Sequence, residues 1–138
     1  MVTEWLNPHF NIEELPARPI PIRAGDSAWK QVDPRRLPAY VERSIDNGLG
    51  WVVFEPNDKH TWALVREQVV DFLTLLWRDN RLVGTTPEEA FFVKVDRTTM
   101  TQTDLDNGRL IVNVGIAPLR PAEFVVFRIG MWTGLSDD

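Results

Sequence analysis

Residues Thr85–Arg128 read TTPEEAFFVKVDRTTMTQTDLDNGRLIVNVGIAPLRPAEFVVFR and carry the clearest fold signal of the chain. Three β-rich runs lie in or across this stretch, Ala90–Val95, Leu110–Ile116 and Glu123–Ile129, and polar turn-forming segments separate them. Aliphatic, β-branched and aromatic runs bounded in this way are typical of strands. We therefore predict three strands of one core sheet here.

Two amphipathic helices are predicted ahead of these strands. Apolar residues recur at three- and four-residue spacing from Asp58 to about Asp79, which indicates a long helix, capped by Asn57, that covers one face of a sheet. A shorter helix is expected over about Asp33–Asn47. Its first turn is uncertain because the ring of Pro38 clashes with the preceding turn of a regular helix.

A fourth strand is expected at Trp51–Phe54, a compact apolar run between Gly50 and Pro56. The fold class is then α/β (α+β), with a small four-stranded mixed sheet and two main helices on one face. We expect an extended N-terminal arm over residues 1–28, a core domain over 29–130 and a tail over 131–138. Four prolines in the arm oppose helix and central strand.

Composition narrows the function classes. A chain of 138 residues with 43% hydrophobic content fits one globular domain. The net charge of -5 argues against a phosphate-backbone binder, so no nucleic acid partner is expected. No apolar run approaches the roughly 18 residues of a membrane span, so no membrane partner is expected either. The absence of cysteine excludes disulfides and thiolate chemistry.

No catalytic, metal or cofactor site is predicted, and the chain is not expected to be an enzyme. The two histidines, His9 and His60, are separated by an arm and a helix, so a shared metal site would need a long-range coincidence. Asp104–Gly108 weakly resembles a calcium loop, but its acid spacing is wrong. Capping and turn formation explain this segment better.

Several residues are candidates for contacts with a partner. Arg35 and Arg36 place positive charge at a predicted helix start, where the macrodipole disfavours it. They either pair with an acid of the same fold, such as Glu42, or contact an acidic patch on a partner. Trp5 and Trp132 lie in the terminal segments, and we expect them to insert into a neighbouring subunit rather than into the chain's own core.

The sequence from Trp29 to about Trp132 resembles the C-terminal domain of contractile phage tail sheath proteins. Diagnostic segments are WKQVDPRRL at 29–37, FEPN at 54–57, AFFV at 90–93, TTMTQ at 98–102 and PAEF at 121–124. Pro38 departs from the pattern, where an aliphatic residue is usual. Residues Trp5–Pro16 are similar to the opening of full-length sheath proteins, which implies that the arm joins the core directly, without the family's middle domains.

The resemblance implies a structural subunit that polymerises by β-augmentation, in which arms add strands to the sheets of neighbouring subunits. The arm strand would hold Trp5, Phe10, Ile12 and Glu14, and the tail strand would hold Ile129, Met131 and Trp132. The partners implied are further copies, in hexameric rings stacked helically, and an inner tail tube protein. A polar turn with Arg97, Thr101, Asp104 and Asp106 is the candidate tube contact.

The expected function is therefore that of a virion structural protein, a sheath subunit of a contractile tail, tailocin or related contractile injection system. Assembly in the cytoplasm of a bacterial host and residence in the tail or particle sheath are implied. The alternative is an adaptor or capping protein that has a sheath-like core but does not polymerise. Such a protein would bind preformed sheath or tube ends. A baseplate or a tail terminator is a further partner that the resemblance implies for the chain.

Overall fold

The computed structural model describes residues 2–5, 32–119 and 124–134. In chain order the elements are β1 (Val2–Trp5), α1 (Leu37–Gly48), the 3₁₀ helix η3 (Gly50–Phe54), α2 (Lys59–Arg78), α3 (Pro87–Ala90), β2 (Phe91–Lys94), α4 (Gln102–Asp106), β3 (Arg109–Ile116) and β4 (Val125–Trp132). The chain is thus a mixed α/β domain, as the sequence predicts.

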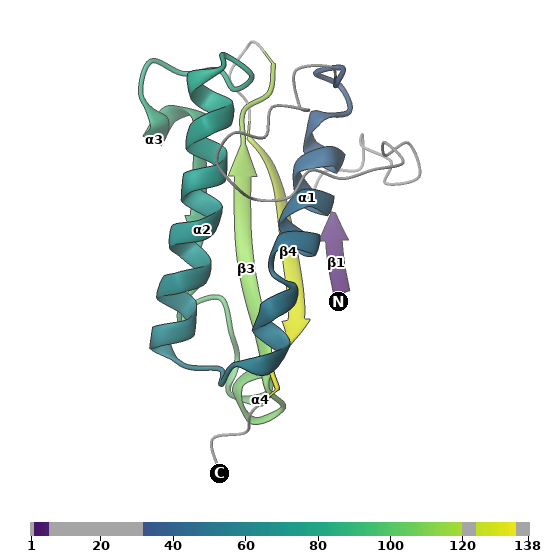
Figure 1. The fold of residues 1–138 in the computed structure, drawn as a ribbon, viewed down its shortest axis with the longest axis vertical. Helices are drawn as coiled ribbons and strands as arrows, with labels where there is room; N and C mark the ends of the chain where they lie inside the picture. Colours follow the sequence, from purple (N-terminus) through teal and green to yellow (C-terminus); the bar gives the residue numbers. More distant parts are fainter. Residues whose placement is uncertain (1, 6–31, 120–123, 135–138) are drawn as a thin grey trace.

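The sheet is built on three antiparallel strands, β2, β3 and β4, and β1 is added at the free edge of β4 to give the order β1-β4-β3-β2 (Figure 1). In this sheet Val112 is the partner of Ile129, and Val93 is the partner of Val114. Every strand pairing among the described residues is antiparallel, so the prediction of a mixed sheet was wrong. Each core strand returns beside its sequence neighbour, which needs no parallel crossover.

The helices α1 and α2 lie on the same face of this sheet, with α2 against β2 and α1 against β4 (Figure 1). Alternate residues of a strand face opposite sides of a sheet, so every second strand residue points toward the helices. The helices cover these residues and bury them. Beneath the helices the core contains Phe91, Val93, Leu110, Val112, Val114, Ile116, Val125, Phe127, Ile129 and Met131. On the other face Phe92 and Phe124 are exposed. This second face is only partly open, because Ile111 on it is 0% exposed.

The long helix α2 forms where its pattern predicts it. The side chain of Asp58 caps the helix by accepting a hydrogen bond from the Thr61 amide at 3.0 Å. The buried stripe consists of Thr61, Trp62, Val65, Val69, Phe72, Leu73 and Leu76. After the C-terminal end, Asn80 adopts a left-handed conformation with φ of 60°, which asparagine tolerates better than most residues. The predicted N-cap, Asn57, lies one residue too early.

The predicted strand at Trp51–Phe54 was wrong, because these residues belong to the 3₁₀ helix η3. The amides of Val52 and Glu55 donate locally to the carbonyl oxygens of Leu49 and Val52, each at 3.0 Å. The segment therefore needs no strand partner. Only Val52 of η3 is fully buried, whereas Phe54 is 77% exposed.

The first helix begins later than the predicted Asp33. Its N-cap position is Arg36, and Pro38 lies within the first turn, where a missing amide proton costs nothing. The carboxylate of Asp33 instead accepts a hydrogen bond from the Arg35 amide at 2.8 Å, which closes a turn ahead of the helix. Pro38 thus marks the start of the regular helix.

Candidate assembly surfaces and partner-binding cleft

The two edges of the sheet differ. At the β4 edge, β1 pairs in a register that places Thr3 opposite Ile129, and Glu4 opposite Arg128. At the other edge, no strand among the described residues pairs with the outer side of β2. A strand with unpaired amide and carbonyl groups is a template for strand addition from another chain.

The structure places the predicted arm residues only in part. Trp5 is the last residue of β1 and lies opposite Phe127. Phe10, Ile12 and Glu14 lie outside the described residues. The strand β1 therefore contains one of the four predicted arm-strand residues.

The predicted tail residues belong to β4, which continues past residue 130 to Trp132. Ile129 and Met131 point into the core and are 0% and 2% exposed. Trp132, opposite Arg109 in the register, is 53% exposed. Of these three side chains, only that of Trp132 offers a large surface to a partner.

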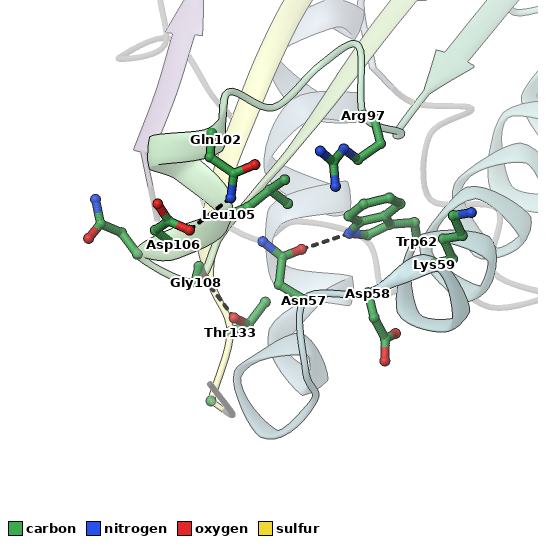
Figure 2. A pocket seen from close by; sticks show the side chains of 12 residues that line it. Asn57, Asp58, Lys59, Trp62, Arg97, Gln102, Leu105, Asp106, Gly108 and Thr133 are labelled. Carbon is green, nitrogen blue, oxygen red and sulfur yellow. Dashed lines mark hydrogen bonds between the residues drawn. The ribbon is translucent and has the colours of Figure 1, made fainter. Parts of the chain in front are cut away.

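A cleft of about 490 Å³ lies where α2 begins, beside α4 and the end of β4 (Figure 2). Its lining residues are Asn57, Asp58, Lys59, Trp62, Arg97, Gln102, Leu105, Asp106, Asn107, Gly108, Thr133 and Gly134. They come from four separate parts of the chain. The cleft presents both positive and negative side chains around a buried indole ring.

Asn57 connects two elements at the base of this cleft by hydrogen bonds. Its Oδ1 accepts a hydrogen bond from Trp62 Nε1 at 2.7 Å (Figure 2). Its Nδ2 donates to the Arg109 carbonyl oxygen at 3.1 Å. The start of α2 is thereby fixed to the start of β3. Thr133 closes the far side, because its hydroxyl donates to the Gly108 carbonyl oxygen at 2.7 Å.

The structure brings two of the four predicted tube-contact residues, Arg97 and Asp106, into this cleft. The other two form the capping box of α4. The Thr101 hydroxyl accepts from the Asp104 amide at 3.1 Å, and the Asp104 carboxylate accepts from the Thr101 amide at 2.9 Å.

The electrostatics of Asp104 follow from this cap. The hydrogen bond from the Thr101 amide lowers the pKa of Asp104, because that bond favours the charged form. Arg109 lies 4.0 Å from the same carboxylate. Asp104 therefore caps α4, whereas Arg97 lines the cleft and is exposed.

Arg35 and Arg36 are exposed at the start of α1. Within residues 32–119, no ion pair joins either of them to Glu42, which is 2% exposed on the inner side of the same helix. The two guanidinium groups remain candidates for a partner contact.

Sequence reasoning missed the cleft itself. Asn57 and Trp62 were assigned a cap and a core position, and Thr133 was assigned to a tail. No periodic pattern links positions so far apart in the chain. The one available signal was the Trp62 indole N–H, which needs a hydrogen-bond acceptor when it is buried.

Neither a metal site nor a membrane span emerges from the part of the chain that the structure describes. No cluster of three or more histidine, aspartate or glutamate side chains is placed to hold a metal ion there. No helix in these ranges combines the length and apolarity needed to cross a bilayer.

Among the described residues, the domain has a sheet with one face covered by helices, the N-terminal strand β1 at one edge and no strand paired beyond β2 at the other. Residues 24–131 match the family model described as the phage tail sheath C-terminal domain. The chain belongs to this family of structural proteins.

Solved structures agree with this assignment. A chain of the anti-feeding prophage (AFP) baseplate, determined with 6-fold symmetry, is 43% identical with a TM-score of 0.60, and the match covers 66% of this chain. A chain of the PVC sheath complex, an extracellular contractile injection system in the contracted state, is 39% identical with a TM-score of 0.59 over 75% of this chain. A chain of the contracted AFP baseplate is 41% identical with a TM-score of 0.57.

These matches span 26% and 28% of the first two solved chains, so the present chain corresponds to about a quarter of their length. Among curated proteins, none matches the chain.

Proposed function

We propose that this chain is a sheath-like subunit of a contractile tail or contractile injection system, and that it polymerises by exchanging strands between copies. The observation that carries the proposal is the strand β1 on the edge of β4, in a domain of the sheath family. An N-terminal strand that adds to a sheet edge makes main-chain hydrogen bonds, and a neighbouring copy can supply the same bonds.

The assembly follows from exchanging β1 between copies. When β1 of one copy occupies the β4 edge of the next, each subunit both donates and accepts a strand. Because donor and acceptor surfaces differ, this contact is head-to-tail and propagates into rings or helical stacks. Hexameric rings around an inner tube, with contraction as a sliding of rigid cores, are the arrangement we propose. Assembly in a bacterial host would precede incorporation into the particle.

The cleft beside Arg97 is the surface we propose for the tube. Arg97 and Asp106 present opposite charges there, together with amide side chains of Asn57 and Gln102. A mixed-charge polar surface suits a contact that must hold the tube and then release it, because exposed ion pairs are individually weak.

A second candidate function is a baseplate adaptor or a cap that does not polymerise. One observation favours it: β1 fills the β4 edge of its own chain, so that among the described residues the β2 edge is the one without a paired strand. Two of the solved chains that match belong to baseplates. A chain of this kind would bind preformed sheath or tube ends and stay monomeric in isolation.

Negative-stain electron microscopy of the purified chain tests the proposal. We expect rings, tubes or filaments from the full chain, and a folded monomer after deletion of residues 1–16, which include β1. A full chain that is strictly monomeric at high concentration would refute the polymerising function. The adaptor function would then be the remaining candidate. Unchanged assembly of the deletion variant would refute the role of the arm.

A further inference from the structure

A second, shallow groove of about 400 Å³ lies between η3 and α2. Trp51 and Leu64 give it an apolar surface, and Leu64 is 40% exposed. The remaining lining residues are Glu55, Glu67, Gln68 and Asp71. The groove therefore combines an indole ring and an aliphatic side chain with three carboxylates.

The groove is held in shape by Gln68. Its Oε1 accepts a hydrogen bond from Trp51 Nε1 at 2.8 Å, and its Nε2 donates to the Gly48 carbonyl oxygen at 3.1 Å. These two bonds tie α2 to the end of α1 and to η3. An occupant would thus meet a surface that is already ordered, which lowers the entropy cost of binding.

The charges of the groove are not balanced within the described part of the chain. No lysine or arginine lines it, and no ion pair there involves Glu55, Glu67 or Asp71. A guanidinium group fits this chemistry well. It can stack on an indole ring, lay its aliphatic stem along apolar surface and pair with a carboxylate.

The start of α1 carries the complementary feature. Arg35 and Arg36 are exposed in the turn before Leu37, and the first turn of α1 holds no acidic residue to offset them. Their charge opposes the helix macrodipole, so their position is unfavourable in an isolated subunit. Asp33 is the one carboxylate in the same turn, and its Oδ1 accepts from the Arg35 amide.

The two features cannot meet within one subunit in this structure. The arginines precede α1, whereas η3 follows its C-terminal end, and a helix of 12 residues is about 18 Å long. We propose that the groove between η3 and α2 binds the Arg35–Arg36 turn of a second copy of this chain. This inference rests on the proposed assembly and adds an electrostatic contact to the strand exchange.

Charge swapping in the full chain tests the contact. The variants R35E/R36E and E67K/D71K should each raise the concentration needed for assembly by about tenfold or more, because each places like charges across the interface. Mixing the two variants, or combining all four substitutions in one chain, should restore assembly. A matched control is R43E/R66E, which reverses two exposed arginines outside both features and should assemble like the original chain.

A peptide titration separates this inference from the proposed function. A peptide of residues 32–39 should shift the NMR signal of the Trp51 indole N–H saturably, whether or not the chain polymerises. The shift should vanish in the E67K/D71K variant and with a peptide in which both arginines are glutamate. If the original peptide leaves that signal unchanged, or if R35E/R36E assembles like the original chain, the inference is overturned. If the peptide binds but the chain never assembles, the proposed binding site in the groove is supported and the proposed sheath function is refuted.

Discussion

The ring of Phe92 lies directly over Gly115 on the sheet face opposite the helices. The two residues are register partners on β2 and β3, and a Cβ atom on Gly115 would lie 2.0 Å from Phe92 Cε2. The same ring packs edge-on against Phe124, with ring centroids 5.5 Å apart. Gly115 thus provides the space that allows an aromatic pair to cover this end of β3.

We predict that Gly115→Ala destabilises the fold by about 1–3 kcal/mol, because the added methyl group displaces the Phe92 ring. Urea unfolding at neutral pH measures the change. In the background of Phe92→Ala the same substitution should cost much less, since the clash is gone, so the two substitutions should not be additive. An equal cost in both backgrounds would show that the ring contact is not the cause.

The base of the cleft beside Arg97 depends on Asn57. We predict that Asn57→Ala destabilises the fold by about 1–3 kcal/mol, because it leaves the Trp62 indole N–H buried without an acceptor. Thermal unfolding measures the loss. Asn57→Asp keeps an acceptor for the indole but removes the donor to the Arg109 carbonyl oxygen, so its cost should be smaller. A neutral Asn57→Ala would contradict the bridging role.

Acid should weaken the α4 cap. Hydrogen bonding lowers the pKa of Asp104 in the folded state below its ordinary value of 3.8. The unfolded chain therefore binds the proton more readily, so the stabilisation is present above pH 3.8 and is lost as pH falls through the folded-state pKa. Asp104→Asn should reduce stability at pH 7, and the difference from the original chain should shrink below about pH 3.8. A difference that does not change with pH would contradict the assignment.

Ionisation of Asp46 should lower the stability of the fold, which is the opposite of its effect at Asp104. Burial raises its pKa above 3.8, and its Oδ1 accepts no hydrogen bond from the described residues. The folded state is then penalised once this carboxyl ionises, so Asp46→Asn should increase the free energy of unfolding at pH 7. The gain should disappear in acid below the unfolded-state pKa. A loss of stability at pH 7 would show that the charged form is favoured in the fold.

The sequence predicted the elements that have long, periodic patterns. The buried stripe of α2 and the runs around Phe91, Val112 and Phe127 lie where those patterns place them. The strand prediction for Trp51–Phe54 failed because a short apolar run is compatible with either a strand or a helix. The hydrogen bonds of this segment join residues i and i+3 and are therefore local. A strand as short as β1, Val2–Trp5, has too few residues for its alternation to be recognised.

The site was less predictable than the fold for a geometric reason. The cleft joins Asn57, Arg97 and Thr133, and the second groove joins Trp51 to Asp71. Only the packing of α2 against the ends of β3 and β4 and against η3 brings such positions together. By contrast, Arg35 and Arg36 could be singled out from sequence, because their conflict with the helix macrodipole is local.

Strand exchange is tested most directly by a cysteine pair at Glu4 and Arg128, which are register partners in a chain without cysteine. Partner Cα atoms about 4.5–5.5 Å apart suit a disulfide. After assembly and oxidation of E4C/R128C, non-reducing electrophoresis should give a ladder of covalent multimers. The displaced pair E4C/V126C should give much less. Assembled particles whose disulfides are all within single chains would contradict strand exchange between subunits.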